Sequence, residues 1–232
     1  WQQFFHDRRF RFIFNPEYAG NSLEKLLGEL LRIPVANKPV SLIDLAGVPT
    51  EIINVVVSTL TRMILDYAIW APREQRKPIL LVCEEAHRYL PRVKSPVTRS
   101  VERQLERIAR EGRKYGVCLA MVSQRPSELS ETALSQCGTI LSMRLNNLND
   151  QAQLRACMSE GARSMVNVIA TLKNRECIIS GDGVPVPMRV MVDTVAEDRR
   201  PASEDPVFSE RWSQDIGAEL LTATVGRWRT ER

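Results

Sequence analysis

The sequence predicts an α/β protein whose mainly parallel sheet lies between helices. Two uncharged apolar runs, residues 79–83 and 117–122, support this prediction. Short runs of this kind are typical of strands buried on both faces of a parallel sheet. Helical patterns precede each run, one from about Pro49 and one over residues 101–115. The alternation of strand and helix indicates an α/β fold.

Residues 1–39 are expected to form a connecting segment. Residues 10–14 predict a short strand closed by Asn15 and Pro16, and residues 22–32 carry five leucines at helical spacing.

The predicted core spans residues 40–195. Residues 40–45 predict its first strand, and a long helix from about Pro49 should follow. With the strand at 79–83 they would make a right-handed βαβ unit with parallel strands. The apolar stripe of the helix is expected to pack against the sheet; it comprises Ile52, Ile53, Val56, Leu60, Met63, Ile64 and Tyr67.

The second half of the core continues with another strand at residues 138–145 and helices near 149–158 and 162–172. Residues 177–180 and 188–192 flank the turn Gly181-Asp182-Gly183 and predict an antiparallel hairpin added to the sheet. From residue 196 to 232 the composition becomes charged and Pro-rich and then amphipathic. This arm should dock on the core or on a neighbouring subunit.

Composition restricts the class of protein. The 232 residues are 44% hydrophobic and 26% charged, and no uninterrupted apolar run approaches the roughly 20 residues of a membrane helix. No secretory signal opens the chain, so a cytoplasmic protein without membrane contact is expected. The chain starts without Met inside apparent structure, which suggests that an upstream part is missing. Its net charge of +4 permits binding to a polyanion.

The five cysteines form no CxxC pair, and the chain has only two histidines. Buried free thiols are therefore expected, rather than disulfides or a zinc site.

Two carboxylates, Glu84 and Glu85, follow the strand at 79–83 directly. In open α/β sheets, ligands bind at the carboxyl ends of the strands. In nucleotide hydrolases with this pattern, the first acid holds the water shell of Mg²⁺ and the second orients the attacking water. The alternative is a strand that ends in a solvated, charged turn.

Three further groups of polar residues have two interpretations each. Gln124 follows the neighbouring strand and either contacts a γ-phosphate or its water, or is an ordinary turn residue. The loop at 91–99 is either a solvated connection or a phosphate-binding loop that uses Arg92, Lys94 and Arg99. A stripe of cations on the helix at 101–115 is either offset by Glu102, Glu106 and Glu111 or meets anions; it comprises Arg103, Arg107, Arg110 and Lys114.

Taken together, the segments 80–87, 106–116 and 122–127, with Arg144-Leu145 and Asn149-Asp150, resemble the HerA branch of the HerA/FtsK ATPases. The resemblance covers about residues 40–230, and residues 202–212 look like the end of HerA proteins. It implies a partial RecA-like P-loop NTPase core that acts in hexameric rings and moves double-stranded DNA with ATP and Mg²⁺.

Carried over by position, the resemblance assigns a role to each site residue. Glu84 matches the acid near Mg²⁺, Glu85 the glutamate that polarises water, and Gln124 the polar sensor. Arg110 best matches the arginine that reaches the neighbouring subunit's nucleotide, with Arg113 as second choice. Expected partners are a nuclease, in DNA repair, or a sirtuin-like effector in antiviral defence.

The chain departs from the family pattern in one respect. A phosphate-binding P-loop needs G-x-x-x-x-G-K-[ST], and this sequence contains no Gly-Lys dipeptide. In HerA proteins that loop precedes the region matched here, so these residues alone are expected to be inactive. Two other hypotheses are an oligomerisation scaffold without catalysis and an FtsK-like or conjugation ATPase with another cargo.

Overall fold

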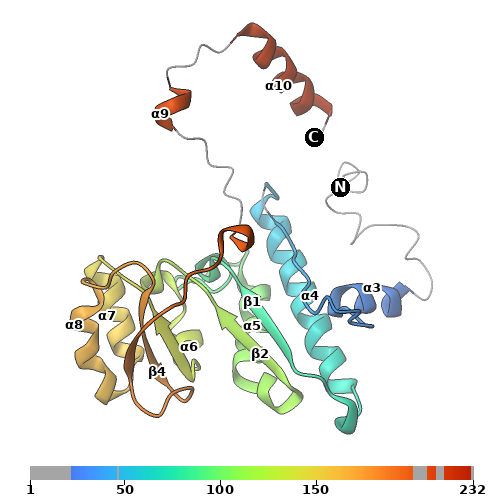
Figure 1. Ribbon diagram of the computed structural model, residues 1–232. Coiled ribbons are helices and arrows are strands. Elements are labelled where there is room, and N and C mark those ends of the chain that lie inside the picture. The colour runs from blue at the N-terminus through green and yellow to red at the C-terminus, as the bar shows by residue number, and fades with distance from the viewer. Residues whose placement is uncertain (1–21, 46, 201–207, 213–216, 231–232) are drawn as a thin grey trace. The chain divides into compact units, whose positions relative to one another are not determined.

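A computed structural model describes residues 22–45, 47–200, 208–212 and 217–230 (Figure 1). The chain divides into two compact units. One comprises Asp44–Thr194 and contains every strand of the described residues, and the other comprises residues 1–43 and 195–232. The predicted strand at 10–14 lies outside the described residues.

A parallel strand pair forms the centre of the Asp44–Thr194 unit. Strand β1, Ile79–Cys83, pairs with β2, Val117–Met121, in a register that sets Cys83 opposite Met121. Helix α5, Arg99–Tyr115, connects them and ends at Gly116, whose φ of 79° lets the chain turn back into β2. The predicted α/β class is confirmed, and so is the parallel pairing of these strands.

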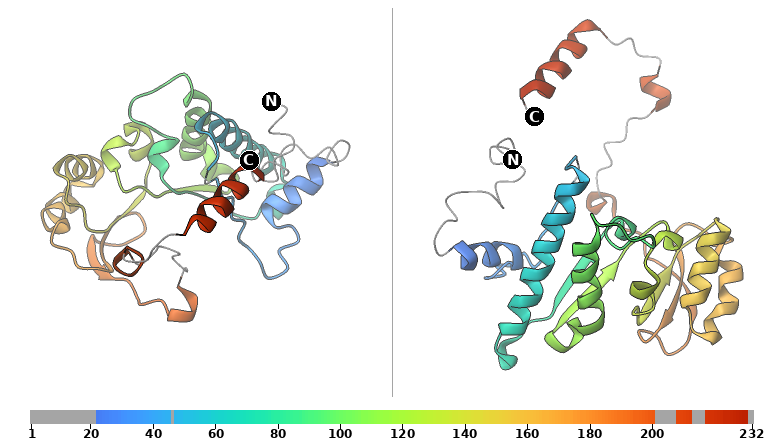
Figure 2. Two further views of the ribbon diagram at one scale, coloured as in Figure 1. Left: turned by 90° about the horizontal axis from the view of Figure 1, so that it is seen from above. Right: turned by 180° about the vertical axis from the view of Figure 1, so that it is seen from behind.

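Helix α4, Thr50–Trp70, lies beside α5 (Figure 2). The Oγ atoms of Ser58 and Ser100 are 2.7 Å apart across this interface. The apolar stripe was expected to pack on the sheet, but α4 packs mainly against α5 instead. Among the described residues of α4, only the partly buried Val57 packs against the core cluster that contains the last residue of β1.

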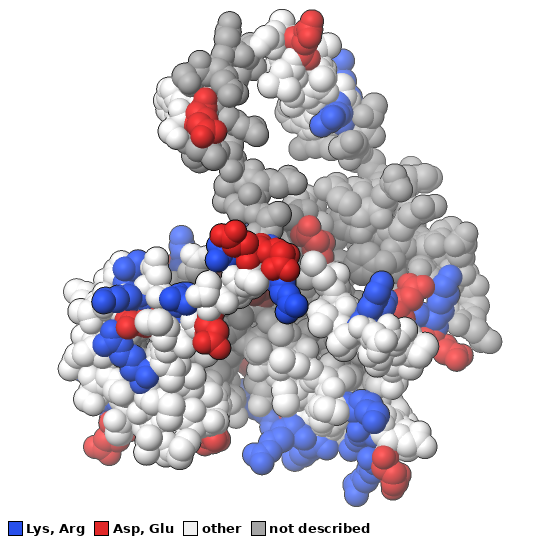
Figure 3. All heavy atoms as spheres, viewed as in Figure 1, with Lys and Arg blue, Asp and Glu red and all other residues white. Residues whose placement is uncertain are grey.

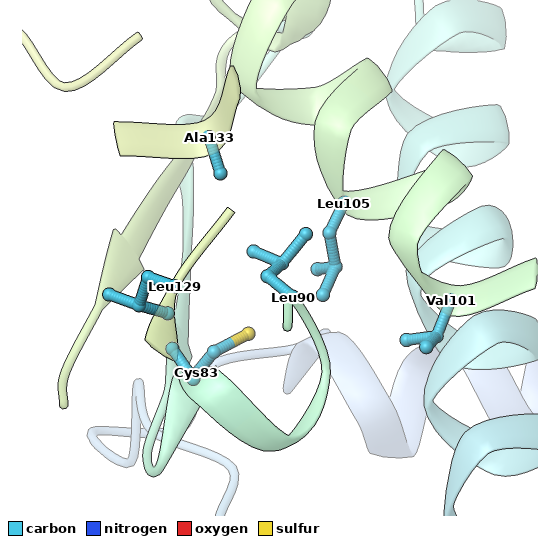
Figure 4. Packing of buried hydrophobic residues seen from close by; sticks show 7 residues of the cluster. Cys83, Leu90, Val101, Leu105, Leu129 and Ala133 are labelled. Carbon is cyan, nitrogen blue, oxygen red and sulfur yellow. The ribbon is translucent and has the colours of Figure 1, made fainter. Parts of the chain in front are cut away.

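The core next to the ends of β1 and β2 is a cluster of fully buried side chains (Figure 4). It joins the last residue of β1 to α5, to the connection after β1, and to helix α6, Glu131–Leu134. Burial at this density resists displacement, so the connections leaving β1 and β2 are held in place. The cluster comprises Cys83, Ala86, Leu90, Val101, Leu105, Leu129 and Ala133.

The strands are buried on one face only, contrary to the prediction of burial on both. Leu80 and Val82 of β1 are 64% and 51% exposed, and Cys118 of β2 is exposed as well. Leu80 stands opposite Cys118 in the register, so these residues share a face. Among the described residues, helices cover only the opposite face.

A second sheet is antiparallel throughout. Strand β3, Thr139–Ser142, pairs with β4, Glu176–Gly181, which pairs with β5, Met188–Met191. The predicted hairpin is present, but it pairs with β3 and does not join the sheet of β1 and β2. Helices α7, Leu148–Cys157, and α8, Val166–Ile169, with the 3₁₀ segment Glu160–Met165 between them, share a buried apolar cluster with β4.

The strand predicted at residues 40–45 is absent, so the expected βαβ unit is incomplete. These residues have no regular structure, and Val40 and Leu42 are 78% and 91% exposed. A strand needs a hydrogen-bonded neighbour, and none of the described strands pairs with this segment.

By length and composition alone, Ile52–Trp70 of α4 would be long and apolar enough to cross a membrane. The same segment carries Arg62 and Asp66, whose side chains pair at 3.4 Å, and it packs against α5 as a core helix does.

The other unit contains three described α-helices: α3, Ser22–Leu31, α9, Phe208–Arg211, and α10, Ala218–Thr230. Helix α3 matches the helix predicted at 22–32. Trp212, Leu221 and Trp228 of the predicted arm are more than half exposed.

Candidate functional site

The backbone folds sharply where β1 ends. The N–H of Val122 donates to Cys83 O, and the N–H of Ala86 donates to Val122 O, both at 2.9 Å. Between these bonds Glu85 has a φ of 49°, in the left-handed region that non-glycine residues seldom occupy. Such backbone costs about 1 kcal/mol or more and is found preferentially at functional sites. The turn places Glu85 beside the end of β2.

The Glu85 carboxylate is contacted from two sides. The Nε2 amide of Gln124 donates to Oε1 at 3.3 Å, and Nδ1 of His87 lies 3.4 Å from Oε2. The Glu85 side chain remains 43% exposed. The structure therefore brings together Glu85 and Gln124, which the sequence had placed at the ends of two different strands.

His87 and Ser123 also belong to this site, and sequence reasoning missed both. His87 Nδ1 lies 3.2 Å from Ser123 Oγ, which accepts a hydrogen bond from the Arg125 N–H at 3.0 Å. Both residues adjoin predicted site residues in the sequence, His87 two positions after Glu85 and Ser123 directly before Gln124. Their positions beside these residues in the sequence could have indicated that they belong to the site.

Glu84 is exposed and makes no hydrogen bond or ion pair with another described residue. No group of three or more His, Cys, Asp or Glu side chains able to hold a metal occurs among the described residues. The donor set therefore does not fit a cation held by protein alone. An unengaged carboxylate does fit a Mg²⁺ bound through water and the phosphates of a nucleotide.

The basic loop is partly neutralised by its own chain. Arg92 pairs with Glu131 at 2.9 Å, and Lys94 Nζ lies 3.8 Å from Glu106 Oε1. Arg99, in the first turn of α5, is exposed, and its side chain has no hydrogen-bond or ionic partner among the described residues. Of the three candidate phosphate contacts, Arg99 is thus the one that is unpaired.

The cationic stripe of α5 has two internal ion pairs. Arg107 pairs with Glu111 at 3.6 Å and Arg110 with Glu106 at 3.5 Å. Glu102 does not offset the stripe as expected, because it is buried and accepts a hydrogen bond from the Thr98 hydroxyl.

Arg113 and Glu85 of the same chain lie at different ends of the strand pair. Arg113 lies in the last turn of α5, just before β2 begins, whereas Glu85 follows the carboxyl end of the parallel strand β1. Lys and Arg gather at the lower end of the face shown in Figure 3, around the connection from α4 to β1. Arg113 therefore belongs to the opposite edge of the strand pair from the carboxylates.

All five cysteines are free, as predicted. Cys83 and Cys177 are buried, but Cys118 is exposed, so the expectation of burial holds only in part. Burial raises the pKa of Cys83, the last residue of β1, to about 11. This thiol therefore stays protonated at neutral pH and belongs to the core.

Sequence comparisons find relatives that are named as helicases. The chain is 34% identical over 187 residues to a probable helicase of Methanocaldococcus jannaschii. This match covers 78% of this chain and 36% of that protein. No protein-family model matches the chain.

Two further relatives are named HerA. The chain is 36% identical over 143 residues to the DNA double-strand break repair helicase HerA of Pyrococcus furiosus, covering 59% of this chain and 25% of that protein. A probable HerA of M. jannaschii is 34% identical to the chain over 153 residues. This match covers 66% of this chain and 29% of that protein. The predicted resemblance to HerA-type proteins is confirmed. The chain spans only about a quarter to a third of the length of these three relatives.

A solved structure also resembles the chain, the genome packaging NTPase B204 from Sulfolobus turreted icosahedral virus 2 in complex with AMPPCP. The match has 13% identity and a TM-score of 0.46, and covers 62% of this chain and 63% of that one. A likeness this distant has no bearing on function.

Proposed function

We propose that this chain is part of an ATP-hydrolysing motor of the HerA type that moves along double-stranded DNA. The observation that carries the proposal is the contact between Gln124 and Glu85 at the carboxyl ends of two parallel strands. In open α/β sheets this edge is where ligands bind, and the relatives named HerA are DNA double-strand break repair helicases. The protein would work in the cytoplasm.

The proposed roles of the site residues follow from their surroundings. Glu85, partly exposed and held by Gln124, acts as the base that orients the attacking water. Gln124 senses the γ-phosphate from the next strand. Glu84, whose carboxylate is unengaged within the described chain, holds the water shell of a Mg²⁺ that would neutralise phosphate charge.

Phosphate binding must come from outside these residues, because the sequence has no Gly-Lys dipeptide for a P-loop. The proposal therefore concerns a longer protein that carries this chain, with residues 40–195 as part of its RecA-like core, residues 1–39 as a connection and residues 196–232 as an arm that docks on a neighbouring subunit. The isolated chain would not hydrolyse ATP.

A ring of subunits, hexameric by analogy with the family, would complete each site. Arg110 is 55% exposed and, once released from its ion pair with Glu106 on the same helix, would reach a neighbour's nucleotide, with Arg113 as second candidate. The unpaired Arg99, with Arg92 and Lys94 once released from their carboxylates, would contact the DNA backbone without reading sequence. A nuclease or sirtuin-like effector would act with the ring, in repair or antiviral defence.

The test of the enzyme assignment is Glu85→Gln in the full-length gene product, compared with Glu74→Gln, an exposed glutamate that precedes β1 and so lies at the opposite end of that strand. We expect Glu85→Gln to lower kcat for ATP by about 10²-fold to 10⁴-fold while ATP binding persists, since the amide cannot accept a proton. The control should behave as wild type. Normal turnover in Glu85→Gln would remove the catalytic assignment of Glu85, whereas a wild-type full-length protein that hydrolyses no ATP would favour the oligomerisation scaffold.

The cargo is tested separately. Stimulation of ATP hydrolysis by double-stranded DNA, and not by single-stranded DNA, would support the HerA-type motor. Stimulation by single-stranded DNA alone would favour the related conjugation ATPase.

A further inference from the structure

We propose that His87 is a positioning residue that fixes the Glu85 carboxylate for water activation. The inference rests on the proposed function, because it assigns a role within the same site. It is carried by the contact of His87 Nδ1 with Glu85 Oε2 at 3.4 Å and with Ser123 Oγ at 3.2 Å.

The geometry excludes the other reading of a serine, a histidine and a glutamate in contact. In a nucleophilic triad the histidine binds serine through one ring nitrogen and the acid through the other. Here Ser123 and Glu85 both face Nδ1. His87 therefore cannot take a proton from Ser123 on one side while the acid supports it from the other.

The two neighbours of Nδ1 determine which ring nitrogen of His87 carries the proton. If Nδ1 were unprotonated, its lone pair would face the carboxylate oxygen, and the two would repel. A proton on Nδ1 turns this into a hydrogen bond shared between Glu85 Oε2 and Ser123 Oγ. Ser123 can accept this bond along with the one from the Arg125 N–H at 3.0 Å, because a hydroxyl oxygen has two lone pairs.

The consequence for Glu85 is restricted rotation of its carboxylate. His87 holds Oε2 and the Gln124 amide holds Oε1. The plane of the carboxylate is therefore fixed by one donor from the segment after β1 and one from the segment after β2. Each carboxylate oxygen has a second lone pair, so both donors leave room for a water. A carboxylate that is already oriented needs no rearrangement when the water is activated.

The contact also links the base to the sensor. His87 is only 17% exposed, and its ring is therefore confined between Glu85 and the segment that begins at Ser123. Ser123 adjoins Gln124 in the chain. A displacement of this segment on phosphate contact would therefore move the acceptor of His87 and the donor to Glu85 together.

The experiment compares His87→Ala with His87→Asn in the full-length gene product. The asparagine amide places an N–H donor where Nδ1 lies, so it can keep the bond to Glu85, whereas alanine removes it. We expect His87→Ala to lower kcat for ATP roughly 10-fold to 100-fold with KM within about twofold, and His87→Asn to recover most of the loss. Ser123→Ala should have a smaller effect, because His87 keeps its bond to Glu85.

A second comparison separates this inference from the proposed function. In a Glu85→Gln background, adding His87→Ala should lower kcat no further, because a residue that acts through Glu85 has nothing left to position. If His87→Ala turns over like wild type, or if His87→Asn fails to recover activity and KM rises with the loss of kcat, the positioning role is wrong. If Glu85→Gln itself turns over normally, the role of Glu85 as base fails instead, and if the wild-type protein hydrolyses no ATP, the proposed function fails.

Discussion

Arg110 and Glu106 are joined across one turn of α5, with the guanidinium Nη2 3.5 Å from Oε2 of the carboxylate. Glu106 also accepts from the Ser130 hydroxyl at 3.4 Å and lies 3.8 Å from Lys94 Nζ. One carboxylate, only 15% exposed, therefore contacts both the proposed trans-acting arginine and a residue of the basic loop. The pair is long at 3.5 Å and Arg110 is 55% exposed, while Glu106 keeps Lys94 and the Ser130 hydroxyl as partners when Arg110 leaves it.

Arg110→Ala is predicted to lower ATP turnover by about 10³-fold or more without loss of ATP binding, because an arginine that contacts a neighbour's phosphates stabilises only transition-state charge. Arg103→Ala, on the exposed stripe of the same helix, is the matched control and should behave as wild type.

Mixing subunits shows whether Arg110 acts in trans. Rings assembled from equal amounts of Arg110→Ala and Glu85→Gln subunits should regain activity at about a quarter of their sites, those with Glu85 from one subunit and Arg110 from the next. A mixture as inactive as either variant alone would contradict a role between subunits.

Arg99→Ala is predicted to weaken DNA binding by the full-length protein at low salt and to reduce the slope of log K against log salt by about 1, the expected loss of one phosphate contact. Arg92→Ala should have a smaller effect, since Arg92 is already paired with Glu131. The measurement is a binding titration at several salt concentrations, and equal slopes for all three proteins would remove this loop from the DNA interface.

Gly112→Ala is predicted to lower the free energy of unfolding by about 1 to 3 kcal/mol, the usual cost of overpacking. A Cβ at this position would lie 2.4 Å from the backbone oxygen of Val117, where α5 crosses the start of β2. The clash exceeds the gain of about 1 kcal/mol that alanine normally brings to a helix interior. Gly161→Ala is the control, because its Cβ would meet no atom within 4 Å. Denaturant unfolding monitored by circular dichroism provides the comparison.

Glu176 provides a prediction for pH. The Lys173 N–H at 2.6 Å and the Arg189 guanidinium at 2.5 Å hold the pKa of this carboxyl below its ordinary value. Because the pKa is lower in the folded state, the stabilisation is complete above the ordinary glutamate pKa and is lost as the pH falls through the folded value. The difference in midpoint of unfolding between wild type and Glu176→Gln should therefore shrink as the pH is lowered from about 7 to about 3. A difference that grows on acidification would contradict the assignment.

The sequence was informative where a local pattern determines the outcome. The uncharged apolar run at 79–83 predicted β1, although only one face of the strand is buried, and the acids after it had to lie at the strand's carboxyl end. The inward residues of α5, Val101, Leu105 and Ile108, followed from helical spacing alone.

Pairing between distant segments was harder to predict. Residues 40–45 have a strand's composition, but no described strand pairs with them, and the hairpin of β4 and β5 pairs with β3. The pairing of a strand with a given sheet edge depends on contacts across the whole chain, so the composition of one segment does not predict it. The bond of His87 to Glu85 was missed for a related reason, because it depends on the left-handed turn at Glu85 and on the position of Ser123 beyond β2.

The left-handed backbone of Glu85 places thermostability and the proposed chemistry in conflict at one residue. Glycine would relax the main chain there, and asparagine would tolerate it better than glutamate does. Either change would relax the backbone and remove the carboxylate that is proposed as the base. A substitution chosen at residue 85 for heat resistance would therefore remove the proposed base.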